Sequence, residues 1–170
     1  MLKKIAIALM LILPMGLAAQ TPKFGHVASQ EIIVLMPEYT KAMSDMETLQ
    51  KQYTTELQSL GEEITRKMQE YQTALQEGNL PQNIQDRRQR DIQEMMEKRE
   101  QYEQEAYQDL RKKSDEMLAP IYQKLDNALK EVGAAEGMIY IFDLSRTYIP
   151  YIDEKQSTDV TQKIKTKLGI

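Results

Sequence analysis

Few side chains in this sequence are of the types that perform chemistry. His26 is the single histidine, and there is no cysteine. A zinc site or a nucleophile–histidine–acid triad needs several such groups placed together, so a lone histidine supports neither. The seven glycines form no phosphate-binding loop. The sequence therefore predicts no catalytic residue, no metal and no cofactor, and it gives His26 a structural role in a candidate strand.

Charged residues follow the pattern of a solvated helix surface. Acidic positions such as Glu94 and Glu97 are interleaved with basic ones such as Lys98, and this spacing is typical of helix faces that point to water. The densest basic cluster is formed by Arg87, Arg88 and Arg90. It is either a charged helix surface balanced by neighbouring aspartates or a contact for anionic lipid or lipopolysaccharide headgroups.

The first 19 residues predict a secretory signal peptide. Lys3 and Lys4 precede an apolar run over residues 5–13, and cleavage is expected near Ala19/Gln20. The run is shorter than the ~20 residues that a membrane-spanning helix needs. Export of a cysteine-free chain indicates the periplasm. Without the two lysines, 20 basic residues remain against 26 acidic ones, a net charge of −6, so no nucleic-acid partner is expected.

A repeat of apolar residues predicts a long helix that begins at Pro37. The steps between apolar positions follow an eleven-residue repeat, which only a helix can produce. Pro37 suits a first helical turn, and the breakers at residues 77–81 predict the tip of a hairpin. The repeat comprises Ala42, Met46, Leu49, Tyr53, Leu57, Leu60, Ile64, Met68, Tyr71 and Leu75.

The segment after the tip predicts a second long helix, over residues 82–132. The same eleven-residue spacing recurs at Met95, Ala106 and Met117, so the two helices can pack along their whole length. The apolar stripe of this second arm is narrow and can bury only one helix contact, which predicts an arm that stands in solvent. Pro120 is expected to kink the second helix, and Gly133 is expected to end it.

The remaining residues predict a small β part made from both ends of the chain. Candidate strands are Phe24–Ala28, Met138–Phe142 and Thr147–Ile152, and a closing helix is expected to begin at Ser157. Residues 20–36 and 133–170 then form a β body, and residues 37–132 form a helical-hairpin arm. The predicted fold is mainly α with a small β part, an antiparallel coiled-coil-like hairpin on a β-strand body.

This order of parts resembles the Skp/OmpH family of periplasmic chaperones. The segments that carry the resemblance are KFGHVASQEIIVLMPEY (23–39), LAPIYQKLDNALKEVGAAEGMIYIFDLS (118–145) and STDVTQKIKTKLG (157–169). The resemblance implies a "jellyfish"-like homotrimer whose three arms enclose a cavity. It also implies an ATP-independent holdase that keeps unfolded outer-membrane β-barrel proteins from aggregating on their way to the outer membrane.

Client-binding residues are expected among apolar side chains near the arm stripes. Methionine is flexible and polarizable, and it suits contacts with many different apolar partners. The candidates are Met43, Met68, Leu80, Ile84, Met95 and Met96. The alternative function is a structural coiled-coil spacer or adaptor of the cell envelope, although the flanking β segments are short for that class of protein.

Overall fold

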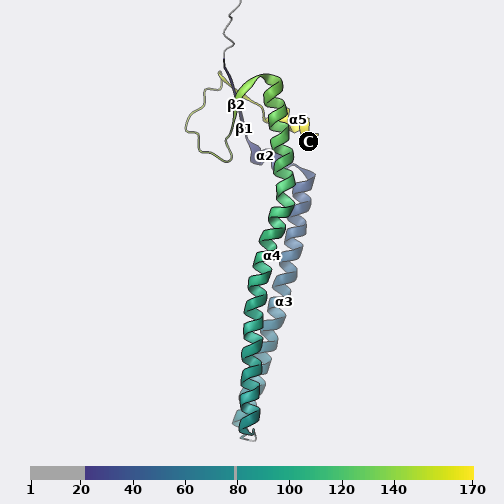
Figure 1. The fold of residues 1–170 in the computed structure, drawn as a ribbon, viewed down its shortest axis with the longest axis vertical. Helices are drawn as coiled ribbons and strands as arrows, with labels where there is room; N and C mark the ends of the chain where they lie inside the picture. Colours follow the sequence, from purple (N-terminus) through teal and green to yellow (C-terminus); the bar gives the residue numbers. More distant parts are fainter. Residues whose placement is uncertain (1–21, 79) are drawn as a thin grey trace, which may run out of the picture. The chain divides into compact units, whose positions relative to one another are not determined.

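The computed structural model describes residues 22–78 and 80–170, so the predicted signal peptide (1–19) lies outside the described residues. The described chain is mostly helical, with one small sheet (Figure 1). It divides into two compact units, one of them Gln30–Asn127 and the other formed by residues 22–29 with Ala128–Gly169. The elements are β1 (Lys23–Val27), α2 (Ser29–Ile33), α3 (Pro37–Gln76), α4 (Gln82–Glu136), β2 (Met138–Asp143), β3 (Ser157–Asp159) and α5 (Thr161–Leu168).

Helices α3 and α4 form the predicted antiparallel hairpin (Figure 1). Pro37 occupies the first turn of α3, as expected. A turn with Gly78 at a φ of 70° separates the two helices, and glycine adopts this left-handed conformation at little cost. Beyond the turn, the side chain of Gln85 donates a hydrogen bond of 2.8 Å to the carbonyl oxygen of Leu80. In the structure α3 ends at Gln76 and α4 begins at Gln82, on either side of the expected hairpin tip.

The predicted apolar stripes form the seam between the two helices. Ala42 and Ile64 of α3 and Ala106 and Ile121 of α4 are all buried. Two of these four are alanines, which let helix backbones approach closely. Toward the tip the burial weakens, and Leu75 is exposed. The hairpin therefore buries a single seam and no thicker core.

The small sheet has three parallel strands in the order β2-β1-β3, with β1 in the centre. Gly25 of β1 aligns with Ile141 of β2. A Cβ on Gly25 would lie 2.6 Å from the Met138 sulfur and 3.3 Å from the Thr158 carbonyl oxygen, so a side chain there would displace Met138 and crowd the β3 backbone. Val27 is also buried. The sheet joins the two ends of the chain, as the sequence predicts.

The third strand is not the one expected from the sequence. Thr147–Ile152 forms no strand, and Ser157–Asp159 pairs with β1 instead. Pro150 lacks the N–H that a ladder needs. Ile149 and Ile152 are half-buried, so this segment buries its apolar side chains as a loop rather than by strand pairing. The prediction that Ser157 caps the closing helix was also wrong, because α5 begins at Thr161.

Helix α4 is longer than the sequence indicates. It passes Gly133 and ends at Glu136, followed by Gly137 at a φ of 66°. A Cβ on Gly133 would lie 3.1 Å from the Ile141 Cδ1 atom, so this glycine serves helix–sheet packing and not capping. The helix also continues through Pro120, and the kink expected there stays a prediction. No helix among the described residues is long and apolar enough to cross a membrane.

Candidate functional site

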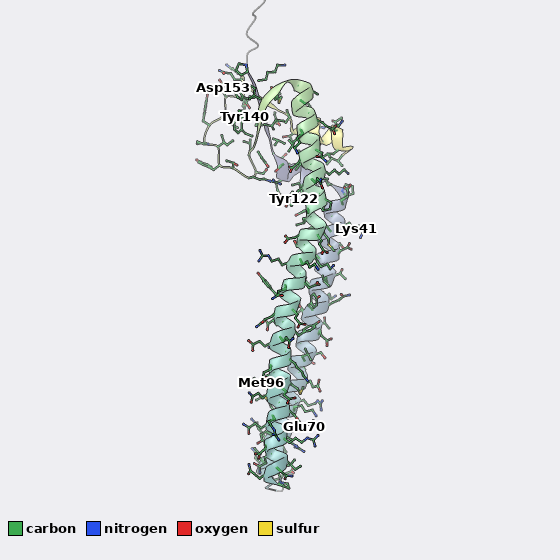
Figure 2. The ribbon with its side chains drawn as sticks, in the orientation of Figure 1. Lys41, Glu70, Met96, Tyr122, Tyr140 and Asp153 are labelled. Carbon is green, nitrogen blue, oxygen red and sulfur yellow. The ribbon has the colours of Figure 1, made fainter. Side chains whose placement is uncertain are left out.

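The six apolar side chains predicted to bind clients fall into two groups. Met43, Met68 and Met96 are exposed on the hairpin, and Met96 leaves 52% of its surface accessible. Figure 2 shows Met96 on the flank of α4. The other three, Leu80, Ile84 and Met95, are half-buried. The predicted set is therefore spread along the hairpin and does not form one compact patch.

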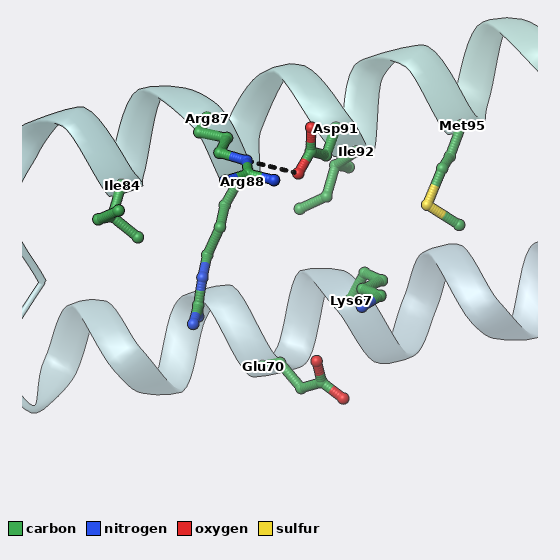
Figure 3. Close-up of a pocket in the computed structure, with 8 residues that line it drawn as sticks. All are labelled: Lys67, Glu70, Ile84, Arg87, Arg88, Asp91, Ile92 and Met95. Atoms are coloured by element: carbon green, nitrogen blue, oxygen red, sulfur yellow. Dashed lines mark ion pairs between the residues drawn. The ribbon is translucent and has the colours of Figure 1, made fainter.

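A cavity of about 290 Å³ lies near the tip, between α3 and α4 (Figure 3). Ile84 and Met95 line it together with Arg87 and Arg88, so the structure brings two predicted apolar residues and two predicted basic residues to one place. Arg88 extends from α4 toward α3. Arg90 does not line this cavity.

The positively charged side chains near the tip are only partly paired with carboxylates of the hairpin. Arg87 lies 4.0 Å from the Asp91 carboxylate, and both side chains are mostly exposed, so the pair contributes little to stability. The cavity is also lined by Lys67 and Glu70 of α3. Three basic, two acidic and three apolar side chains therefore line the cavity at this end of the hairpin.

A polar contact that the sequence did not reveal ties the two helices together in mid-arm. The Tyr53 hydroxyl donates a hydrogen bond of 2.7 Å to the Asp109 carboxylate, and the Tyr53 ring meets the Tyr102 ring edge to face at 5.9 Å. The hydrogen bond to Asp109 raises the pKa of Tyr53, because it favours the protonated phenol. Only the position of Tyr53 on the apolar stripe hinted at an interior contact.

Nearer the start of α3, Lys124 of α4 donates a hydrogen bond to Glu38 and forms an ion pair with it. This contact lowers the pKa of the Glu38 carboxyl. Glu38 precedes Tyr53 in α3. Their partners in α4 occur in the opposite order, because Asp109 precedes Lys124. The two contacts therefore fix an antiparallel register.

A shallow groove on the flank of the hairpin was missed by sequence reasoning. Here it is called the flank groove, and its lining includes Gly61, Ile64, Met96, Glu97, Glu100 and Glu103. A neighbouring hollow adds Tyr107, which is 69% exposed and shares Glu100 and Glu103 with the groove. A signal existed in the sequence, because Met96 and Tyr107 are eleven residues apart, the repeat of the buried stripes.

The sheet exposes an aromatic face. Phe24 of β1 stacks on Tyr140 of β2, with ring centroids 6.4 Å apart, and Tyr140 contacts Phe142. The loop that follows β2 places Tyr148 and Tyr151 almost wholly in solvent, at 89% and 78% exposed. A cavity of about 400 Å³ lies between this loop and the sheet. So much exposed aromatic surface on a small unit is typical of an interaction site.

His26 joins two strands of the sheet. Its Nδ1 atom lies 2.9 Å from the Ser157 hydroxyl oxygen on β3. Asp159 aligns with His26 in the register and accepts a 2.8 Å hydrogen bond from the Thr161 N–H. The pKa of the Asp159 carboxyl is lowered mainly by hydrogen bonds from Thr161. The nearby His26 and Lys165 lower it further. In the described part of the chain, no group of three or more His, Cys, Asp or Glu side chains could hold a metal ion.

Comparison with known proteins assigns the family. A family model described as outer membrane protein (OmpH-like) matches residues 23–168. The chain belongs to the OmpH-like family. The OmpH-like fold is also seen in a crystal structure from Caulobacter crescentus CB15, assigned as an outer membrane chaperone, with a TM-score of 0.70. That protein is 13% identical, and the match covers 87% of this chain and 84% of the other. No curated protein sequence matches this chain.

We predict that Tyr53→Phe lowers the free energy of unfolding of the hairpin, because it removes the hydrogen bond to Asp109. Urea unfolding followed by circular dichroism measures the change. Tyr71→Phe is the matched control, since Tyr71 also lies half-buried on the stripe and its hydroxyl has no hydrogen bond within the described residues. Equal loss in both variants would show that the Tyr53 hydroxyl contributes nothing.

Proposed function

We propose that this protein is an ATP-independent holdase chaperone of the periplasm that binds unfolded outer-membrane β-barrel proteins. Membership of the OmpH-like family supports a chaperone role. The observation that carries the proposal is a long two-helix hairpin that buries one seam and leaves apolar side chains such as Met43, Met96 and Tyr107 exposed. A purely structural coiled coil has no need of such residues on its outer faces.

The mechanism follows from the weakness of each contact. An unfolded β-barrel protein exposes apolar side chains and unpaired strand edges, both of which promote aggregation. Scattered, flexible methionine side chains can contact such a chain at many points without requiring a particular sequence. Several arms acting on one client multiply these contacts through effective concentration. The client leaves when folding in the membrane is more favourable than the sum of the contacts, so no nucleotide is needed.

We predict that the mature protein suppresses the light scattering of a urea-unfolded outer-membrane β-barrel protein diluted into buffer without nucleotide. A Met43→Glu/Met68→Glu/Met96→Glu variant is expected to suppress scattering less, because charge replaces apolar contact surface. The matched control is Gln52→Glu/Gln69→Glu/Gln89→Glu, which adds the same charge at exposed polar positions of the same helices.

Two outcomes of this experiment count against the proposal. Unaltered aggregation at a large excess of the wild-type protein would favour the alternative of an envelope spacer or adaptor. Suppression by the wild type that both variants retain in full would leave the holdase activity in place but remove the three methionines from the binding surface.

Self-association is a second part of the proposal. The aromatic face of the sheet, with Tyr140 and Phe142 exposed and Tyr148 and Tyr151 beside it, provides a contact between copies of the chain in a homotrimer. Contact between copies would bury part of this exposed aromatic surface, and the burial also stabilises each body. The cavity between the loop and the sheet leaves room for side chains of a second copy.

We predict that Tyr148→Ser/Tyr151→Ser lowers the mass of the protein in solution from that of a trimer toward that of a monomer. Both tyrosines are highly exposed in the single chain, so their loss leaves its fold intact. Size-exclusion chromatography with light scattering measures the mass, and Tyr107→Ser on α4 is the control. A wild-type protein that remains monomeric at every concentration would contradict this part of the proposal.

Contact with anionic lipid or lipopolysaccharide is a separate candidate function. The tip cavity supports it, because Arg87 and Arg88 lie beside apolar Ile84 and Met95. We predict that liposomes containing anionic lipid bind the wild type more tightly than the Arg87→Ala/Arg88→Ala/Arg90→Ala variant. Co-sedimentation measures the binding, and equal binding of the two proteins would end this hypothesis.

A further inference from the structure

On its α3 side the flank groove is lined by Gly61, a glycine in the interior of a helix. Glycine in a helix interior costs about 1 kcal/mol relative to alanine. The backbone of Gly61 is not in the left-handed conformation that favours glycine. The nearest atom to a Cβ built on Gly61 is the Arg99 Nε at 3.8 Å, so a methyl group would fit there in ordinary van der Waals contact with Arg99. Buried Ile64 lies in the same lining. The groove therefore has an apolar base with no side chain of the described residues filling it.

Two acidic side chains lie between two apolar ones along the α4 side of the groove. Met96, Glu100, Glu103 and Tyr107 follow steps of 4, 3 and 4 residues, which places all four on one face of the helix. Met96 and Tyr107 at the two ends are exposed, and the two glutamates lie between them. The stripe extends about 16 Å, the length of an extended polypeptide segment of about five residues.

The charge of this surface is negative. Glu97, Glu100 and Glu103 line the groove, and Arg99 is the one basic residue among the lining side chains. Glu97 accepts a hydrogen bond of 3.1 Å from Gln93. Across the described parts of the chain, none of these three carboxylates takes part in an ion pair. Three negative charges beside open apolar surface disfavour an anionic partner and favour a cationic one.

We propose that the flank groove is a docking surface for cationic, aromatic-bearing segments of unfolded polypeptides. This inference rests on the proposed chaperone function and specifies the chemistry of the preferred client segment. Lysine or arginine side chains of the client pair with Glu97, Glu100 and Glu103. The Tyr107 ring receives a cation on its face, and the Met96 sulfur packs against an aromatic ring of the client.

The test uses a fluorescein-labelled peptide of about twelve residues in which lysine and tyrosine alternate, and a second peptide with glutamate in place of each lysine. Fluorescence anisotropy measures binding to the mature protein. The groove variant is Glu97→Gln/Glu100→Gln/Glu103→Gln. The control variant is Glu47→Gln/Glu56→Gln/Asp126→Asn, which removes the same charge from exposed positions outside the groove.

The groove variant is expected to bind the lysine peptide about tenfold more weakly, the sum of three exposed charge contacts, and the control variant to bind it within about twofold of the wild type. The difference should shrink as salt rises from about 0.05 M to about 0.5 M, because exposed charges are screened. Equal binding of the lysine peptide by wild type and groove variant, or equal binding of the two peptides by the wild type, would overturn the inference.

Failure of the inference and failure of the proposed function give different results. If the wild type suppresses aggregation of the β-barrel client while the groove variant binds the lysine peptide normally, the chaperone function stands and the groove assignment falls. If the wild type neither suppresses aggregation nor binds the lysine peptide, both fall together.

Discussion

The contact between two narrow apolar stripes is the interaction on which the rest of this structure depends. Ala42 and Ile64 on α3 meet the facing stripe of α4, and both stripes repeat every eleven residues, so the two helices stay in contact over a long distance. The stripe is too narrow to cover more than one partner helix. Every other face of the hairpin must therefore either be polar or remain available to another molecule.

A repeating seam determines that the helices pair but specifies only weakly which residues face each other. Shifting one helix by eleven residues would restore most apolar contacts, so the register needs side chains that occur once. The hydrogen bond between Tyr53 and Asp109 and the ion pair between Glu38 and Lys124 meet this need. These two contacts select one register among several. Exposed polar contacts of this kind add little to the stability of the hairpin.

Periodicity and breaker residues predicted the hairpin well, because both act locally. Pro37 at the start of α3 and Gly78 in the turn needed no knowledge of distant contacts. The β part was harder, because strand identity is decided by partners. Thr147–Ile152 has the composition of a strand but forms a loop over the aromatic side chains, whereas polar Ser157–Asp159 pairs with the free edge of β1. The flank groove was missed for the same reason, since its lining combines Gly61 of one helix with Met96 of the other.

The position of β1 in the middle of a parallel sheet determines the order in which the protein can fold. Val27 and Met138 are 111 positions apart in the sequence, and both neighbours of β1 lie beyond the hairpin. A chain delivered N-terminus first presents β1 with two unpaired edges until β2 and β3 have followed. The hairpin contains mainly local contacts, so it forms early and shortens the loop that sheet closure must bridge. During this interval β1 has the same unpaired edges that characterise an unfolded β-barrel protein.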